Sequence, residues 1–213
     1  MKLLLTSAGI TNDSLANALK SLVKGSIKIA FIPTAANVSD EKKDWLIRNF
    51  NECERLGTVD IVDISALSKP VWLPRLKKAN VIFVGGGNTS YLMKCISSSG
   101  LKKELSPLLK SRVYVGISAG SIVTNKTLQP SSGFIFGNKE APEALGMVDF
   151  YIRPHMNAPN FRAKKIDEEN LDKIANRFNA DLYAIDDNSA VLVNEGKIQV
   201  ISEGTWKLYK GSK

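Results

Sequence analysis

The sequence predicts an α/β fold in which a mainly parallel central β-sheet lies between two layers of helices. Short apolar runs alternate with longer segments of helical periodicity, which is typical of a parallel sheet buried on both faces. Each helical segment is long enough to cross the sheet and return the chain to a parallel strand. With 213 residues, of which 44% are hydrophobic, the chain is expected to form one domain, 1–213, with a substantial core.

Six apolar runs are the expected strands. They lie at 2–6, 27–32, 59–62, 81–84, 113–117 and 150–153. The first run is interpreted as a strand and not as a signal peptide, because the apolar stretch stops at Thr6. The helices expected between the strands span 13–22, 40–56, 88–98 and 101–110. Right-handed crossovers would place the carboxyl ends of the strands at one edge, where sites collect in this architecture.

The pattern changes in the last third of the chain. Residues 127–146 are rich in Ser, Gly, Pro and Asn, which predicts a long loop bordering a site. A helix is expected at 167–178. Three alternating stretches then follow at 182–185, 190–193 and 198–201, and the last two are separated by Asn-Glu-Gly-Lys. This spacing predicts a C-terminal antiparallel hairpin that closes one edge of the sheet.

Charge and cysteine content narrow the classes of function. The net charge is +8, but the lysines are scattered in short pairs on segments of helical character, so we expect acidic small substrates and no nucleic-acid partner. The two distant cysteines, Cys53 and Cys95, indicate a reduced, cytoplasmic protein. A membrane span and a metal site are not expected, since the sequence has no long apolar segment and only one histidine.

The strongest chemical signal is Gly-Ile-Ser-Ala-Gly at 116–120, directly after a buried strand. A Gly-x-Ser-x-Gly segment between a strand and a helix is typical of a nucleophile elbow, where a strained serine needs small neighbours. A tight turn that merely contains serine is the alternative. The preceding strand favours Ser118 as a nucleophile whose hydroxyl lies at the carboxyl edge of the sheet.

A serine hydroxyl needs a neighbouring base to accept its proton. His155 is the only histidine in the chain, and it follows the expected strand at 150–153. A lone histidine is otherwise an ordinary surface or core residue. In combination with Ser118, its position at a strand end makes it the expected general base.

Three glycines follow the expected strand at 81–84. Glycines allow close approach of the backbone to a ligand, and their N–H groups can point at an anion. The segment matches neither common phosphate-loop spacing, so we interpret it as half of an oxyanion hole, with one N–H from Gly86 and one from Ala119. A tight turn without a ligand is the alternative.

Four motifs in this order resemble peptidase family S51, the dipeptidase E and cyanophycinase group, over most of the chain. They are the glycine loop at 83–89, the serine turn at 116–120, the Arg-Pro-His segment at 153–155 and the acidic segment at 184–190. The resemblance implies a fold related to class I glutamine amidotransferases, with serine in place of cysteine. It also implies hydrolysis of short peptides, with N-terminal aspartyl dipeptides as the leading substrate, and no metal or organic cofactor.

The third member of the catalytic triad is where the sequence departs from dipeptidase E. That pattern has an aspartate about fifteen residues beyond the serine, but here the stretch is Pro-Ser-Ser-Gly at 130–133. Glu140 is the nearest acid downstream, while Asp186 and Asp187 qualify only if the C-terminal segment folds back. A relocated acid, a Ser-His dyad and a much-weakened enzyme all stay open.

Two residues are expected to bind substrate by the same resemblance. Asn88 directly follows the three glycines, and Arg162 lies where a family arginine could receive a substrate carboxylate, although a surface arginine is the equal alternative. Two other classes of function remain: a serine esterase of the α/β-hydrolase type, and a non-catalytic binding protein that lost the acid. A monomer or a homodimer is expected.

Overall fold

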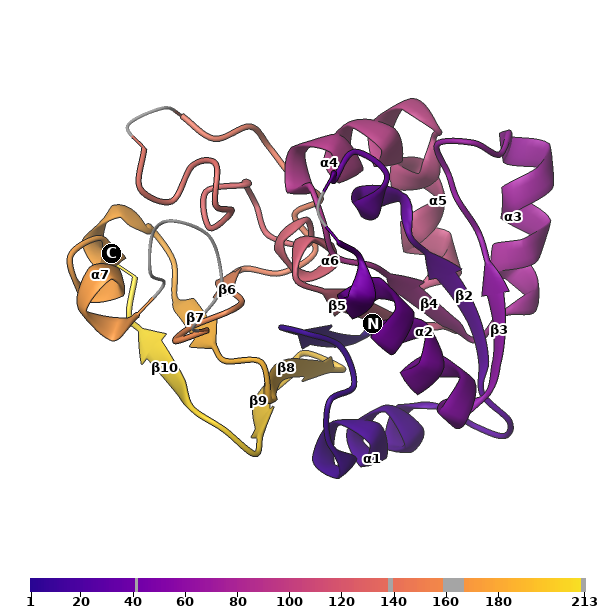
Figure 1. The fold of residues 1–213 in the computed structure, drawn as a ribbon, viewed down its shortest axis with the longest axis horizontal. Coiled ribbons are helices and arrows are strands. Elements are labelled where there is room, and N and C mark those ends of the chain that lie inside the picture. The colour runs from indigo at the N-terminus through magenta and orange to yellow at the C-terminus, as the bar shows by residue number, and fades with distance from the viewer. Residues whose placement is uncertain (41, 138–139, 159–166, 212–213) are drawn as a thin grey trace.

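A seven-stranded sheet forms the centre of the computed structural model, which describes residues 1–40, 42–137, 140–158 and 167–211 (Figure 1). Its strand order is β3-β2-β4-β5-β1-β8-β9. The first five strands in this order are mutually parallel, and β8 and β9 pair antiparallel at one edge. The bounds are β1 Lys2–Thr6, β2 Lys28–Ile32, β3 Thr58–Ile61, β4 Val81–Val84, β5 Val113–Ile117, β8 Ser189–Asn194 and β9 Lys197–Ser202. The predicted fold class is therefore confirmed.

Helices cover both faces of this sheet (Figure 1). Along β1, Leu4 belongs to one buried cluster and Leu3 and Leu5 to another, because successive side chains of a strand point to opposite faces. The Leu4 cluster includes residues of α1 Asp13–Leu22 and α2 Asp44–Leu56. The other includes residues of α3 Lys69–Lys78, α4 Thr89–Ser98 and α5 Leu101–Leu108. The sheet is thus the middle of three layers.

Helix α3 was not expected from the sequence, and it contains two prolines. Pro70 lies in the first turn, where a backbone N–H has no partner within the helix anyway. Pro74 does cost a hydrogen bond inside the helix, but Trp72 and Leu76, one turn apart, are fully buried against the sheet. Burial of these two large side chains outweighs the lost bond.

A second, three-stranded sheet has the order β10-β7-β6. Its strands are β6 Tyr151–Arg153, β7 Leu182–Ile185 and β10 Trp206–Tyr209, and the sequence did not predict β10. The expectation that 150–153 adds to the main parallel sheet is wrong, since β6 pairs with β7 instead. The helix expected at 167–178 is also shorter, because α7 spans Glu168–Asp172 and a separate 3-10 turn follows at Ala175–Arg177.

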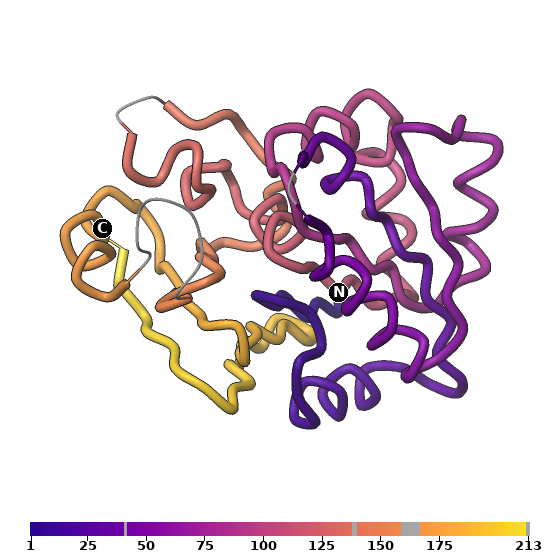
Figure 2. The backbone as a smooth tube through the Cα atoms, in the orientation of Figure 1, coloured from indigo at the N-terminus to yellow at the C-terminus, as the bar shows by residue number. Residues whose placement is uncertain are grey.

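The predicted C-terminal hairpin is formed by β8 and β9. Its two turn residues, Glu195 and Gly196, both have positive φ, at 52° and 84°. A two-residue turn of this kind matches the right-handed twist of the strands that it joins. After β7 the chain leaves the second sheet, enters the main sheet as β8, and turns back as β9 at its outer edge (Figure 2).

Candidate active site

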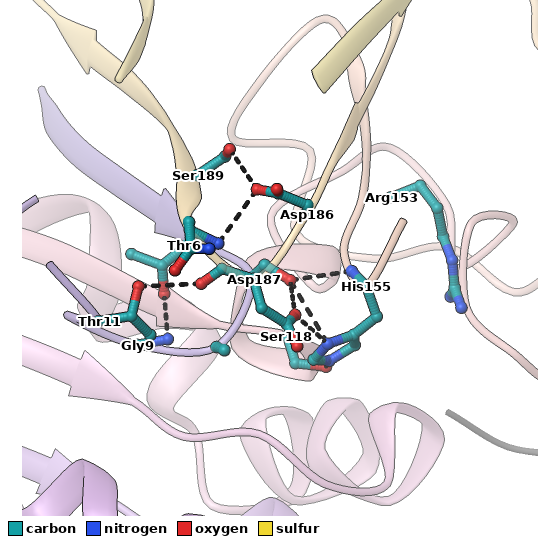
Figure 3. A network of polar contacts seen from close by, with 12 residues as sticks. Thr6, Gly9, Thr11, Ser118, Arg153, His155, Asp186, Asp187 and Ser189 are labelled. Carbon is teal, nitrogen blue, oxygen red and sulfur yellow. Dashed lines mark hydrogen bonds and ion pairs between the residues drawn. The ribbon is translucent and has the colours of Figure 1, made fainter. Parts of the chain in front are cut away.

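The site lies where the two sheets meet, at the carboxyl ends of two pairs of parallel strands. In the main sheet β1 and β5 are neighbours, and the next residues after them are Ser7 and Ser118. In the second sheet β6 and β7 are neighbours, and His155 and Asp187 each lie two residues beyond their strand. Figure 3 shows the side chains of Ser118, His155 and Asp187 converging. The expected gathering of functional residues at strand ends holds, but two sheets contribute to it.

Ser118 occupies a strained turn between β5 and the short helix α6, Ala119–Ile122. Its φ is 49° and its ψ is −104°, a combination that non-glycine residues rarely adopt. The glycines on either side permit the turn. A Cβ at Gly116 would lie 2.6 Å from the Ser121 backbone nitrogen, and one at Gly120 would lie 2.0 Å from the Val84 carbonyl oxygen. The strand and the helix can approach only because both positions lack side chains.

We therefore expect Gly120→Ala to destabilise the protein by about 3 kcal/mol, because a methyl group pressed against a β4 carbonyl forces the backbone apart. For a chain of this size the melting temperature should fall by roughly 10 °C. The matched control is Gly133→Ala, since a Cβ there meets no atom within 4 Å and the φ of Gly133 is not positive. Differential scanning calorimetry of both variants checks this, and equal melting temperatures would contradict it.

His155 bridges Ser118 and Asp187. Its Nε2 lies 2.8 Å from Ser118 Oγ, and its Nδ1 lies 2.6 Å from Asp187 Oδ1. A carboxylate oxygen at that distance accepts the Nδ1 proton, which leaves the lone pair of Nε2 facing the serine hydroxyl. The imidazole is therefore oriented to take the Ser118 proton, and the carboxylate is placed to stabilise the imidazolium that results.

Asp187 is the carboxylate that contacts the imidazole, among the three that the sequence left open. Burial acts to raise the pKa of Asp187, but the hydrogen bonds from His155 and Ser7 and the attraction to the imidazole outweigh it and hold that pKa below its usual value. Asp187 is thus ionised at neutral pH. Glu140 is exposed, and the oxygens of Asp186 accept hydrogen bonds from Asn188, Ser189 and Thr205.

The turn from β7 to β8 brings Asp187 to the site. Asp186 Oδ1 accepts from the Ser189 hydroxyl at 2.6 Å and from the Asn188 N–H at 3.1 Å, which closes a tight Asx-type turn. Asp187 lies between these anchors, and its backbone carbonyl accepts from the Thr11 hydroxyl at 2.9 Å. The C-terminal segment therefore does fold back, as an acid at this position requires.

The backbone around Ser118 offers donors for a developing negative charge. As the first residue of α6, Ala119 has an N–H without a partner inside the helix. Gly86 lies directly beside Ser118, because a Cβ added to it would be 3.4 Å from Ser118 Cβ. Apart from hydrogen bonds internal to helices and strands, neither N–H donates to a backbone carbonyl within the described ranges. This arrangement suits an oxyanion hole, with one donor from each loop.

Gly86→Ala should fold normally yet act slowly, because Gly86 lies outside the positive-φ region and its added methyl makes an ordinary contact. That methyl would occupy space beside Ser118 which a substrate carbonyl must enter. We expect kcat/KM to fall roughly 100-fold, with the melting temperature nearly unchanged. Steady-state kinetics and a thermal melt check this, and an unaltered kcat/KM would remove Gly86 from the site.

The structure describes one of the two expected substrate-binding residues. The Asn88 side-chain oxygen accepts from the Tyr91 N–H at 2.9 Å and caps α4, so its place in the structure is that of a helix cap. Arg162 lies outside the described residues. Sequence reasoning missed Trp45, a partly exposed α2 residue whose ring atom Cζ3 would lie 3.7 Å from a methyl on Gly86. The indole therefore forms a wall near Gly86 and Ser118.

The predicted loop 127–146 packs against the strand that leads to His155. Arg153, at the end of β6, is only 1% exposed, and its guanidinium donates to the Pro130 carbonyl at 2.7 Å and to the Ser132 hydroxyl at 3.3 Å. The loop and β6 are thus joined through a buried cation. Figure 3 shows this side chain directed away from the imidazole.

Three further observations concern metal ligands, membrane-spanning helices and the cysteines. The described ranges contain no group of three or more His, Cys, Asp or Glu side chains arranged to hold a metal ion. No described helix combines the length and apolar character that crossing a bilayer requires. Cys53 and Cys95 are both buried and form no disulfide.

Comparison with known proteins identifies the family. The family model for peptidase family S51 matches residues 3–201. A peptidase E of Nostoc sp. is 28% identical over 91% of this chain and 79% of its own, and a Drosophila melanogaster protein named "Probable alpha-aspartyl dipeptidase" is 28% identical over 67% and 62%. A crystal structure of a candidate peptidase E from Listeria monocytogenes superposes with a TM-score of 0.77 at 25% identity, covering 95% of this chain and 98% of its own. The chain belongs to peptidase family S51 and, with it, to the serine peptidase hydrolases.

Proposed function

We propose that this protein hydrolyses short peptides through an acyl-enzyme intermediate on Ser118. The observation that carries the proposal is the continuous chain of contacts from Ser118 Oγ through His155 to Asp187 Oδ1, with lengths of 2.8 and 2.6 Å. Such a chain activates a weakly acidic hydroxyl at neutral pH. The strained backbone of Ser118 and the adjacent N–H groups support the same chemistry.

In the acylation half of the reaction, Ser118 Oγ forms a bond to the scissile carbonyl carbon while its proton passes to His155 Nε2. The carbonyl oxygen gains negative charge and accepts hydrogen bonds from the Gly86 and Ala119 N–H groups. The C–N bond then breaks, and Nε2 returns the proton to the leaving amine. Water subsequently attacks the ester carbon, gives its proton to Nε2 and releases the acid, and Ser118 regains a proton.

Dipeptides with N-terminal aspartate are the substrates that we propose. The names of relatives support this choice, since the Drosophila protein is named for aspartyl dipeptides. The net charge of +8 also favours an acidic substrate over a basic one. The names of the relatives and the positive charge together support an aspartyl substrate.

A small substrate panel tests the proposal. We expect Asp-Leu to be cleaved with a kcat/KM at least roughly 100-fold above Ala-Leu, and Glu-Leu to fall between them. N-acetyl-Asp-Leu has a blocked amino terminus, so a failure to cleave it would show that a free amino terminus is required. Cleavage of p-nitrophenyl acetate without any peptide cleavage would favour an esterase. Tight binding of peptides without turnover would favour a binding protein. The argument for that function was that the triad acid is missing, and the contact between Asp187 and His155 weakens it.

The cytoplasm is the location that we propose, supported by the two buried, unpaired cysteines. The lysines are scattered along the sequence, which does not favour a nucleic-acid partner. The site is of the kind that binds a small molecule, which supports a short peptide as the substrate. We propose a monomer or homodimer, which light scattering coupled to size-exclusion chromatography measures directly.

A further inference from the structure

Ser7 is the residue of the site that neither the motifs nor the triad accounts for. It follows β1 directly, is 0% exposed, and its own N–H donates to the Ser189 carbonyl at 3.3 Å. Its hydroxyl lies 2.7 Å from Asp187 Oδ1, 2.9 Å from the His155 backbone nitrogen and 3.4 Å from His155 Nδ1. One buried hydroxyl thus contacts two of the three triad members.

The hydrogen-bond capacity of a hydroxyl decides what each contact is. Ser7 has one proton to give and lone pairs to accept with. The ionised carboxylate of Asp187 can only accept, so the Ser7 proton goes to Oδ1. The backbone N–H of His155 can only donate, so it gives its proton to Ser7 Oγ. The longer approach to Nδ1 is then a contact between two donors that both point at the same carboxylate oxygen.

The backbone of His155 needs such an anchor. Its φ is 63°, in the left-handed region that costs free energy for a residue other than glycine. The hydrogen bond from its N–H to a hydroxyl directly after a buried strand holds that conformation in place. The next residue is fixed too, because the Met156 N–H donates to the Ile185 carbonyl of β7 at 3.0 Å.

We propose that Ser7 is a positioning residue, which couples the His155 backbone to the Asp187 carboxylate and so keeps the imidazole aligned on Ser118. It acts through its neighbours and touches neither the substrate nor the reacting atoms. The proposal rests on the proposed function for its kinetic consequence. Its structural consequence, a fixed geometry of the imidazole, is independent of which peptide is cleaved.

The kinetic test replaces Ser7 with alanine, which removes the hydroxyl and adds no atom that must be accommodated. We expect kcat on the best peptide of the panel to fall roughly 10- to 100-fold, with KM within about twofold, because alignment is lost and binding groups are kept. The control is Thr124→Val. It removes another fully buried hydroxyl, one that donates to the Ser121 carbonyl and contacts no triad member.

A spectroscopic test separates positioning from general damage. Because His155 is the only histidine, nitrogen-15 labelling of histidine gives one imidazole to follow by NMR. In the wild type the Nδ1 proton, held in a 2.6 Å contact, should give a slowly exchanging signal far downfield. Ser7→Ala should broaden or abolish that signal while the protein stays folded by its amide spectrum, and Thr124→Val should leave it unchanged.

The outcomes are distinct. An unchanged imidazole signal and unchanged kcat in folded Ser7→Ala would overturn the positioning role, even if the peptidase function stands. Loss of the signal equally in Thr124→Val would show general damage and would also overturn it. If no peptide is cleaved by the wild type, the proposed function fails, but the imidazole signal still tests Ser7.

Discussion

Replacing Ser118 with alanine is expected to lower kcat for peptide hydrolysis by roughly 10⁴- to 10⁶-fold. The reason is that no other group can form the acyl bond, so the two-step route through an ester is lost completely. What remains is the stabilisation of the carbonyl oxygen by backbone N–H groups, which can assist only direct attack by water. Substrate binding should persist, since alanine removes a single oxygen from a partly exposed position.

Two measurements check this expectation. Release of the peptide products is followed by chromatography. In the second measurement the wild type is treated with an activated ester, and mass spectrometry looks for an acyl group on the peptide that contains Ser118. The control is Ser121→Ala, which removes a fully buried hydroxyl from the same short helix, where it donates to the Thr6 carbonyl at 2.7 Å. That variant should lose stability but keep kcat within a few-fold. Activity of Ser118→Ala above one hundredth of wild type would exclude Ser118 as the nucleophile.

The division of the site between two sheets makes its geometry depend on how the chain passes from one to the other. Ser7 and Ser118 follow adjacent parallel strands of the main sheet, so their spacing is fixed by the register of β1 and β5. The spacing of His155 and Asp187 is fixed likewise by β6 and β7. Side-chain contacts and the β7–β8 turn relate one pair to the other.

The sequence predicted the features that local chemistry dictates. The glycines around Ser118 are required by the strained turn itself, so the elbow could be recognised without any tertiary information. The five parallel strands were likewise predicted by their apolar runs. The helix α3 was missed because its prolines are local evidence against a helix, whereas the burial of Trp72 is a tertiary effect.

The residues that the sequence could not assign are those whose roles depend on pairing between distant segments. A three-residue strand such as β6 carries no information about its partner, so its place in the second sheet was missed. The choice between Asp186 and Asp187 depends on one turn, in which adjacent carboxylates point in different directions. Ser7 had one usable signal, its position directly after a buried strand.

Asp187→Asn is expected to lower kcat by roughly 10³- to 10⁴-fold, the second largest effect. If the amide presents its oxygen to Nδ1, the imidazolium formed during acylation lacks a negative partner. If it presents its NH₂ group, Nδ1 must be the acceptor, the ring proton moves to Nε2, and Nε2 can no longer take the serine proton. Both orientations of the amide therefore impair the base, and neither changes the size of the side chain.

The neighbouring Asp186→Asn is the matched control, because it makes the same chemical change one residue away. Asp186 accepts from Ser189, Asn188 and Thr205, so its replacement weakens the turn and should lower the melting temperature. It should leave kcat within about tenfold, since Asp187 still carries its charge. Kinetics and thermal melts of the two variants give a crossed pattern, with Asp187→Asn stable and slow and Asp186→Asn less stable and active. The reverse pattern would assign the acid to Asp186, and full activity in both would leave a Ser-His dyad as the catalytic unit.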